Sequence, residues 1–117
     1  MAGDIRAGKR GRPHPTTLVV EGRLVLVRVT GELDTDTAGT LDATLADAEA
    51  AVSPPAPVVV DLTGVSFLGA AGLAVLMDHH ERCGALGSTM LVVPGSRAVR
   101  QAVARSHARL AFLPASR

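Results

Sequence analysis

Apolar residues alternate along the chain between short β-branched runs and helical stripes. Runs at residues 18–20 and 24–29, separated by the turn-like Glu21-Gly22-Arg23, predict a hairpin of two strands. Asp34 then offers a capping carboxylate before an apolar stripe with steps of three and four residues, which predicts a helix. The stripe consists of Ala38, Leu41, Leu45, Ala48 and Val52. Prolines within residues 54–57 end it.

The second half of the chain continues this alternation. The continuous apolar run 58–62 predicts a central strand that is buried on both faces, with helices above and below. A helix is expected to begin near residues 69–72 and to end within the glycine-bounded residues 84–87. Its apolar face is predicted to hold Leu73, Leu76, Met77, His80 and Cys83.

The last elements predicted are a strand at residues 89–93, a helix and a short strand at 110–113. Ser96 is expected to cap this helix. Its inward residues are predicted to be Val99, Ala102 and Val103, and its outward ones Arg97, Arg100 and Arg105. The order β-β-α-β-α-β-α-β predicts a single α/β domain over residues 18–117, with a mixed, largely parallel sheet. Residues 1–17 are predicted to form a disordered basic tail.

Composition narrows the function classes. The chain has 117 residues, which is enough for one domain. Only 2% of them are aromatic, so the chain lacks the stacking residues that proteins binding single-stranded nucleic acid or sugars use, and these two classes are not expected. Cys83 is the only cysteine, so no intrachain disulfide can form. We expect the Cys83 side chain to be buried and to pack as a small hydrophobic group. Because no signal peptide and no apolar run of spanning length is present, the sequence predicts a cytoplasmic protein.

The charges are unevenly distributed. Residues 1–17 carry a net charge of +3, residues 18–93 carry −7, and residues 94–117 carry +5. An acidic body with a basic end suits a basic protein partner better than DNA. We therefore expect no direct contact with nucleic acid.

Residues that could support chemistry are few. A metal site could be suggested by the cluster of possible ligands His79, His80, Glu81 and Cys83, because His80 and Cys83 could meet on one helical face. Two ligands are too few to form such a site. We expect no metal, no cofactor and a partly buried His80. Asp61 at a strand end is expected to be a turn or capping residue, and no nucleophile stands beside a base, so an enzyme is not predicted.

Two stretches carry a family resemblance. They are Thr30-Gly31-Glu32-Leu33-Asp34 and residues 58–76, VVVDLTGVSFLGAAGLAVL. Together they resemble STAS domains, the family of anti-sigma factor antagonists that also forms the cytoplasmic tails of sulfate transporters. The resemblance extends over about residues 18–113, and the predicted element order matches that fold.

The resemblance implies a partner switch. An antagonist of this family docks on an anti-sigma factor kinase and frees the sigma factor, and the kinase ends the interaction by phosphorylating a serine where the helix after the central strand begins. The family segment is similar to Asp-Ser-Ser-Gly-Leu, whereas this chain has Gly69-Ala70-Ala71-Gly72-Leu73, with Ala70 in the acceptor position. Ser66 and Thr63 are the nearest hydroxyls and the candidates for a shifted phosphosite.

The resemblance also implies where a partner binds. Glu32 and Asp34 match the acidic pair of the first stretch, which implies contact with basic groups; helix capping and solvated turn charge are the alternatives. The other expected contact residues are Leu68, Gly69, Ala70, Ala71, Gly72 and Leu73, with an apolar surface around Leu68 and Leu73. The alternative function is a ligand-binding or transporter-accessory STAS module, in which residues 69–72 receive an anion. The residues lack the lysine and hydroxyl of a phosphate-binding P-loop.

Overall fold

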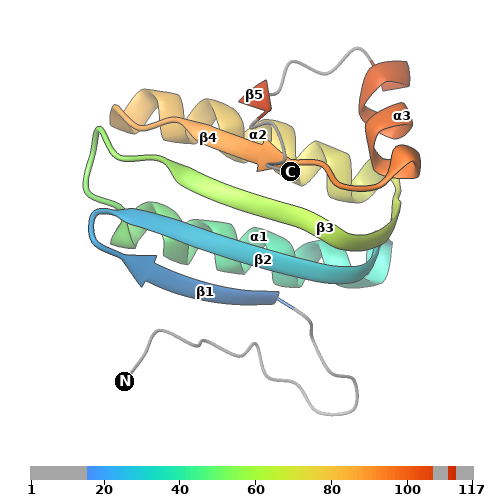
Figure 1. Ribbon diagram of the computed structural model, residues 1–117, viewed down its shortest axis with the longest axis horizontal. Helices are drawn as coiled ribbons and strands as arrows, with labels where there is room; N and C mark the ends of the chain where they lie inside the picture. Colours follow the sequence, from blue (N-terminus) through green and yellow to red (C-terminus); the bar gives the residue numbers. More distant parts are fainter. Residues whose placement is uncertain (1–15, 107–110, 113–117) are drawn as a thin grey trace.

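A computed structural model of the protein describes residues 16–106 and 111–112, which form one five-stranded sheet with three helices (Figure 1). The sheet order is β1-β2-β3-β4-β5; β1 and β2 are antiparallel and the other neighbours are parallel. The strands are β1 Thr16–Glu21, β2 Leu24–Leu33, β3 Val58–Leu68, β4 Met90–Val93 and β5 Ala111–Phe112. The helices are α1 Thr35–Ala51, α2 Ala70–Leu86 and α3 Arg97–Ser106. The predicted fold class and element order are confirmed.

The predicted boundary of the basic tail, after residue 17, is wrong by two residues, because Thr16 and Thr17 belong to β1 and pair with β2. β1 begins at Thr16, two residues before the predicted strand, and the Thr16 side chain is buried. Residues 1–15 lie outside the described part of the chain.

The core lies between the sheet and the two long helices. α1 and α2 lie behind the sheet in Figure 1, and alternate residues of β2, β3 and β4 join both helices in one buried cluster. β3 is not buried on both faces as predicted, because Val59 and Asp61 remain partly exposed while Val58, Val60 and Leu62 are buried. The physical reason is that both long helices cover the same face, and only the short α3 packs against β3 as a further helix.

The ends of α1 are set by local chemistry. Asp34 is the N-cap: its Oδ1 accepts hydrogen bonds from the backbone amides of Asp36 at 3.0 Å and Thr37 at 3.1 Å. Thr37 Oγ1 in turn accepts from the Asp34 amide at 2.9 Å, which completes a capping box. The predicted cap is therefore confirmed.

α2 begins at a glycine and ends at one. Gly69 is the N-cap without a side-chain bond, and Gly87 ends the helix in the left-handed conformation with φ of 89°. The predicted inward face is wrong at Met77, which is 40% exposed, and it omitted His79, which is 1% exposed. His80 is partly buried, as predicted.

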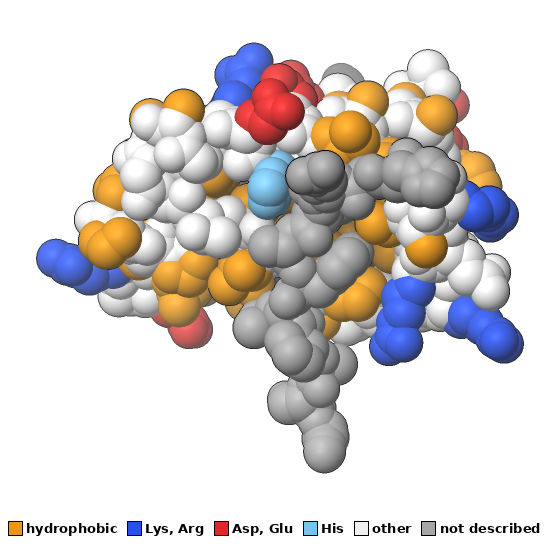
Figure 2. All heavy atoms as spheres, turned by 90° about the horizontal axis from the view of Figure 1, so that it is seen from above, with side chains coloured by type: hydrophobic (Ala, Val, Ile, Leu, Met, Phe, Trp, Pro, Cys, Tyr) orange, Lys and Arg blue, Asp and Glu red, His pale blue; other side chains and the backbone are white. Residues whose placement is uncertain are grey.

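α3 follows its prediction. Ser96 Oγ accepts from the Val99 amide at 3.1 Å, and the inward side chains of Val99 and Val103 are buried. The three predicted outward arginines are exposed, and Figure 2 shows basic side chains gathered at the end of the molecule where α3 lies. Within the described residues, the arginines of the predicted basic end therefore lie on the exposed surface of this helix.

Candidate partner-binding site

The parallel pairing of β2 and β3 brings the two sequence stretches together at one end of the sheet. Glu32 pairs with Phe67 and Leu33 with Leu68, after register shifts that begin beyond Arg28. The Gly69 amide donates to the Leu33 carbonyl oxygen at 2.9 Å. The start of α2 is thereby fixed to the end of β2.

Gly72 permits a close approach between α2 and β2. A Cβ at this position would lie 2.8 Å from Leu33 Cβ and 3.2 Å from Leu68 Cδ1, which is too near for a side chain. Gly72 itself is buried. Its role is therefore packing, and it cannot offer a side chain to a partner.

The exposed residues at this end form a small surface, which we call the docking surface: Glu32, Phe67, Gly69, Ala70 and Ala71. Glu32 and Ala70 are exposed, Gly69 and Ala71 are partly exposed, and Phe67 retains 50% of its surface. The Phe67 ring lies over Gly69, since its Cε2 would be 3.0 Å from a Cβ built there. The surface combines an aromatic ring, small residues and one carboxylate.

The apolar surface expected around Leu68 and Leu73 is wrong. Both side chains are buried in the core, at 6% and 8% exposure. Phe67 is the exposed apolar residue instead, and the sequence analysis missed it. The signal available was the pair Phe67-Leu68 in a strand, because neighbouring strand residues point to opposite faces.

The Asp34 carboxylate is used inside the protein. It caps α1, is only partly exposed, and its Oδ1 lies 3.1 Å from Thr37 Oγ1. Glu32 engages α1 through its backbone, because its carbonyl oxygen accepts from Thr37 Oγ1 at 2.8 Å. Of the predicted acidic pair, Glu32 is therefore the carboxylate that faces solvent.

The two candidate hydroxyls lie on β3 in different surroundings. Thr63 Oγ1 donates to Asp61 Oδ1 at 2.7 Å, and Asp61 also pairs with Arg28 Nε at 3.3 Å. Partial burial raises the pKa of Asp61, but hydrogen bonds from Thr63 and Arg28 and the Arg28 charge outweigh burial and lower it. Ser66 is exposed, and its hydroxyl lies 3.4 Å from the Gly31 carbonyl oxygen.

Cys83 is the small buried group that was predicted. It is 1% exposed, and burial together with the nearby Glu49 charge raises the pKa of its thiol to about 11. A thiol of this kind remains protonated at neutral pH. It lies on the same buried face of α2 as His79.

Comparison with known proteins gives the family. The fold is a single α/β domain with a mixed sheet, and residues 15–112 match the STAS domain. The chain belongs to the STAS domain family. Within the described residues, each helix is too short or too polar to cross a bilayer.

The similar proteins carry related names. The anti-sigma-F factor antagonist RsfA of Mycobacterium tuberculosis is 34% identical over 79 residues, which cover 68% of this chain and 62% of RsfA. The crystal structure of an anti-sigma factor antagonist from Mycobacterium paratuberculosis matches with 33% identity and a TM-score of 0.70, over 79% of this chain and 76% of that one. Unphosphorylated SpoIIAA, another anti-sigma factor antagonist, shares the fold with a TM-score of 0.71 at 21% identity, over 86% and 88% of the two chains. The chain spans about three fifths of the curated relatives it matches.

Proposed function

We propose that this protein is an anti-sigma factor antagonist that docks on an anti-sigma factor through the docking surface. The observation that carries the proposal is the half-exposed Phe67 beside Glu32, at the end of a STAS sheet whose similar proteins are named anti-sigma factor antagonists. The proposed action is binding without catalysis, and the proposed location is the cytoplasm.

The docking surface has the composition of a small protein interface. An aromatic ring supplies apolar area at low entropic cost, and central aromatic residues dominate many interfaces. Ala70 and Ala71 allow a partner backbone to approach the start of α2 closely. Glu32 would pair with a lysine or arginine of the partner, which agrees with the acidic body of the chain.

We further propose that the partner is kinase-like and that phosphorylation does not switch this antagonist off. Ala70 provides no acceptor oxygen at the usual position. Thr63 is a poor substitute, since its hydroxyl is bound to the Asp61 carboxylate, which would repel a phosphate. Ser66 is exposed and is the better candidate for a shifted phosphosite.

Affinity capture from the native cell tests this function. The full chain is compared with Phe67→Ala and with Leu86→Ala, a control that truncates another exposed apolar side chain at the far end of α2. The proposal predicts an anti-sigma factor that the full chain and Leu86→Ala retain and Phe67→Ala loses. Capture of a transporter subunit instead would favour the transporter-accessory alternative.

Mass spectrometry after incubation of the captured partner with ATP tests the phosphorylation part separately. Residues 69–73 are expected to remain unmodified. Stoichiometric phosphate on Ser66 or Thr63 would show that the switch has moved, and the proposal of an unswitched antagonist would be wrong.

A further inference from the structure

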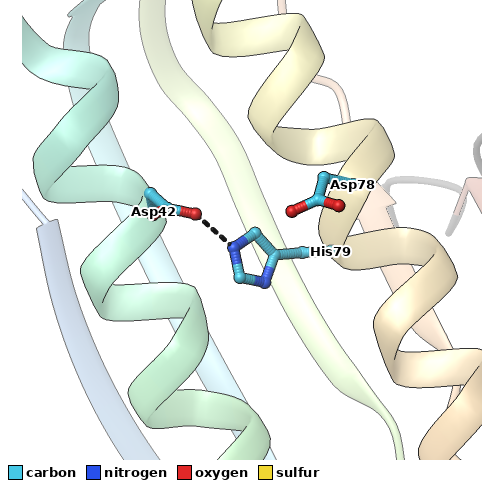
Figure 3. Close-up of side chains that lie close together, drawn as sticks. All are labelled: Asp42, Asp78 and His79. Atoms are coloured by element: carbon cyan, nitrogen blue, oxygen red, sulfur yellow. Dashed lines mark hydrogen bonds and ion pairs between the residues drawn. The ribbon is translucent and has the colours of Figure 1, made fainter.

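A histidine and two aspartates meet between α1 and α2 (Figure 3). Asp42 comes from α1, and Asp78 and His79 come from α2. His79 Nε2 lies 2.6 Å from Asp42 Oδ1, and one ligand atom from each residue lies within 4.8 Å of the others. In Figure 3 the Asp42 carboxylate points toward the ring from α1, and the Asp78 carboxylate projects from α2 above the ring. No family motif in the sequence indicated this cluster.

A fourth side chain fixes the orientation of the imidazole. Glu49, which lies two turns after Asp42 on α1, is hydrogen-bonded to His79 Nδ1. Its side chain is only 10% exposed. Ionised carboxylates can only accept, so in the metal-free protein Nδ1 donates to Glu49 and Nε2 donates to Asp42. A metal ion would displace the Nε2 proton, whereas Glu49 would keep the Nδ1 proton in place. A carboxylate on the far nitrogen is the arrangement that orients metal-binding histidines in proteins.

The cluster opens to solvent on one side. A shallow groove with a volume of about 360 Å³ is lined by Ala38, Gly39, Asp42, Ala74, Val75 and Asp78. The Asp42 and Asp78 side chains are 57% and 51% exposed, whereas the His79 side chain is 1% exposed. Small neighbours leave room for an ion and its water, and the exposed carboxylates can adjust.

We propose that Asp42, His79 and Asp78 bind a divalent transition-metal ion, with Zn²⁺ as the best match. Zn²⁺ accepts one imidazole and two carboxylates, and a water from the groove would fill the fourth position. Mg²⁺ and Ca²⁺ prefer oxygen ligands alone, so the buried imidazole selects against them.

The geometry needs a small adjustment. Ligands of a tetrahedral Zn²⁺ lie about 3.3 Å apart, so Asp42 must retreat from its 2.6 Å contact with Nε2 to admit the ion. Asp78 Oδ2 pairs with Arg82 Nε at 3.1 Å. Because a carboxylate has two oxygens, Asp78 can coordinate through the other oxygen while keeping this pair.

The ion would join α1 to α2. Asp42 and His79 come from different helices, so binding fixes their separation, and a ligand that binds only the folded state raises stability by mass action. The cluster shares no residue with the docking surface, so metal binding can be tested without the proposed partner.

Calorimetric titration of the chelator-treated full chain with ZnCl₂ and CoCl₂ near neutral pH tests the site. We expect one ion per chain, a rise in melting temperature, and a Co²⁺ absorption spectrum without a thiolate charge-transfer band, because Cys83 is not a ligand. Asp42→Asn and Asp78→Asn are each expected to weaken binding by about tenfold or more. Asp47→Asn makes the same charge change at another exposed position of α1 and should leave binding unchanged.

Further variants separate the cluster from other ligands. Arg82→Gln removes the ion pair of Asp78 and keeps the proposed ligand, so affinity should be maintained or increased. His14→Gln combined with His107→Gln should also leave binding intact. Because substitution of the buried His79 can unfold the chain, its role is read from hyperfine-shifted imidazole resonances in the Co²⁺ form. Absence of binding, or binding that survives both Asp42→Asn and Asp78→Asn, would overturn the proposal.

Discussion

The backbone amide of Gly69 donates a hydrogen bond to the carbonyl oxygen of Leu33 at 2.9 Å. This bond connects the N-cap residue of α2 to the last residue of β2. Every residue of the docking surface lies within two positions of one of these two residues in the sequence. The shape of the surface therefore depends on how closely α2 can approach β2.

Gly72→Ala tests that approach. The added methyl would lie 2.8 Å from Leu33 Cβ, which is attached directly to the backbone and cannot rotate away. Overpacking of this kind costs about 1–3 kcal/mol, and the better helix propensity of alanine returns at most about 1 kcal/mol. We expect a loss of stability of about 1 kcal/mol or more in denaturant unfolding.

Gly84→Ala is the matched control for that substitution. It lies on the same helix, and nothing is within 4 Å of its added Cβ. We expect it to stabilise the protein by about 0.5–1 kcal/mol. Equal effects of the two substitutions would contradict the close packing of Gly72 on Leu33.

Glu32→Ala tests the electrostatic part of docking. If its exposed carboxylate pairs with a basic group of the partner, affinity should fall by about tenfold, or about 1.4 kcal/mol, with little change in melting temperature. The on-rate of the unsubstituted chain should decrease with added salt. Glu81→Ala, which removes an exposed acid of α2, serves as the control. Surface plasmon resonance at two salt concentrations measures both the affinity and the on-rate. Equal affinities of the two variants would show that the Glu32 carboxylate does not contact the partner.

Ala70→Asp places a negative charge where the family phosphate would stand. We expect weaker partner binding, because the charge must be desolvated in the interface. The fold should be unaffected, since an acid in the first turn of a helix is favoured by the helix dipole. Ala43→Asp, at an exposed position of α1, should bind like the unsubstituted chain. Unchanged affinity of Ala70→Asp would show that the start of α2 lies outside the interface.

The His79 cluster predicts a pH dependence of stability in the presence of a chelator. Burial lowers the pKa of the His79 imidazole, but hydrogen bonds and charges of Asp42 and Glu49 outweigh burial and raise it above its ordinary 6.5. The imidazolium therefore contributes fully below pH 6.5, and its contribution is lost as the pH rises through the higher folded pKa.

Melting temperatures measured across that interval check the pH prediction. Other polar or ionisable groups on α2 lie near His79, namely Asp78, Arg82 and Cys83. Single substitutions are therefore compared, so that only one of the charges around His79 changes at a time. Asp42→Asn should reduce the decline in stability with rising pH, whereas Asp47→Asn should retain it. A flat profile for the unsubstituted chain would show that His79 does not gain a proton on folding.

Much of the fold follows from local patterns in the sequence. The stripe that ends at Val52 and the caps at Asp34 and Ser96 each depend on neighbouring residues, so they could be predicted. The length of β3 could not, because its last six residues, with the polar Thr63 and Ser66, continue the strand only through pairing with β2 after register shifts. That pairing is a tertiary property.

The identity of the buried histidine was ambiguous for a related reason. Both His79 and His80 lie three or four residues from Leu76 and from Cys83, so helical spacing accepts either one. The partners on α1 decide, since Asp42 and Glu49 follow the buried Leu41 and Ala48 directly and are two turns apart. A search for acids beside the apolar stripe of α1 could have found them.

The sheet register also determines when a nascent chain becomes competent to bind. Leu33 and Gly69 meet only after α1 has crossed over and β2 and β3 have paired, and such non-local contacts form late compared with helices and hairpins. A ribosome-bound chain that has not yet released residues 58–72 holds Glu32 but has no neighbouring Phe67 or Ala70. A partner that binds through the proposed docking surface would therefore recognise only the chain that has completed this pairing, and it would not bind a truncated or misregistered chain.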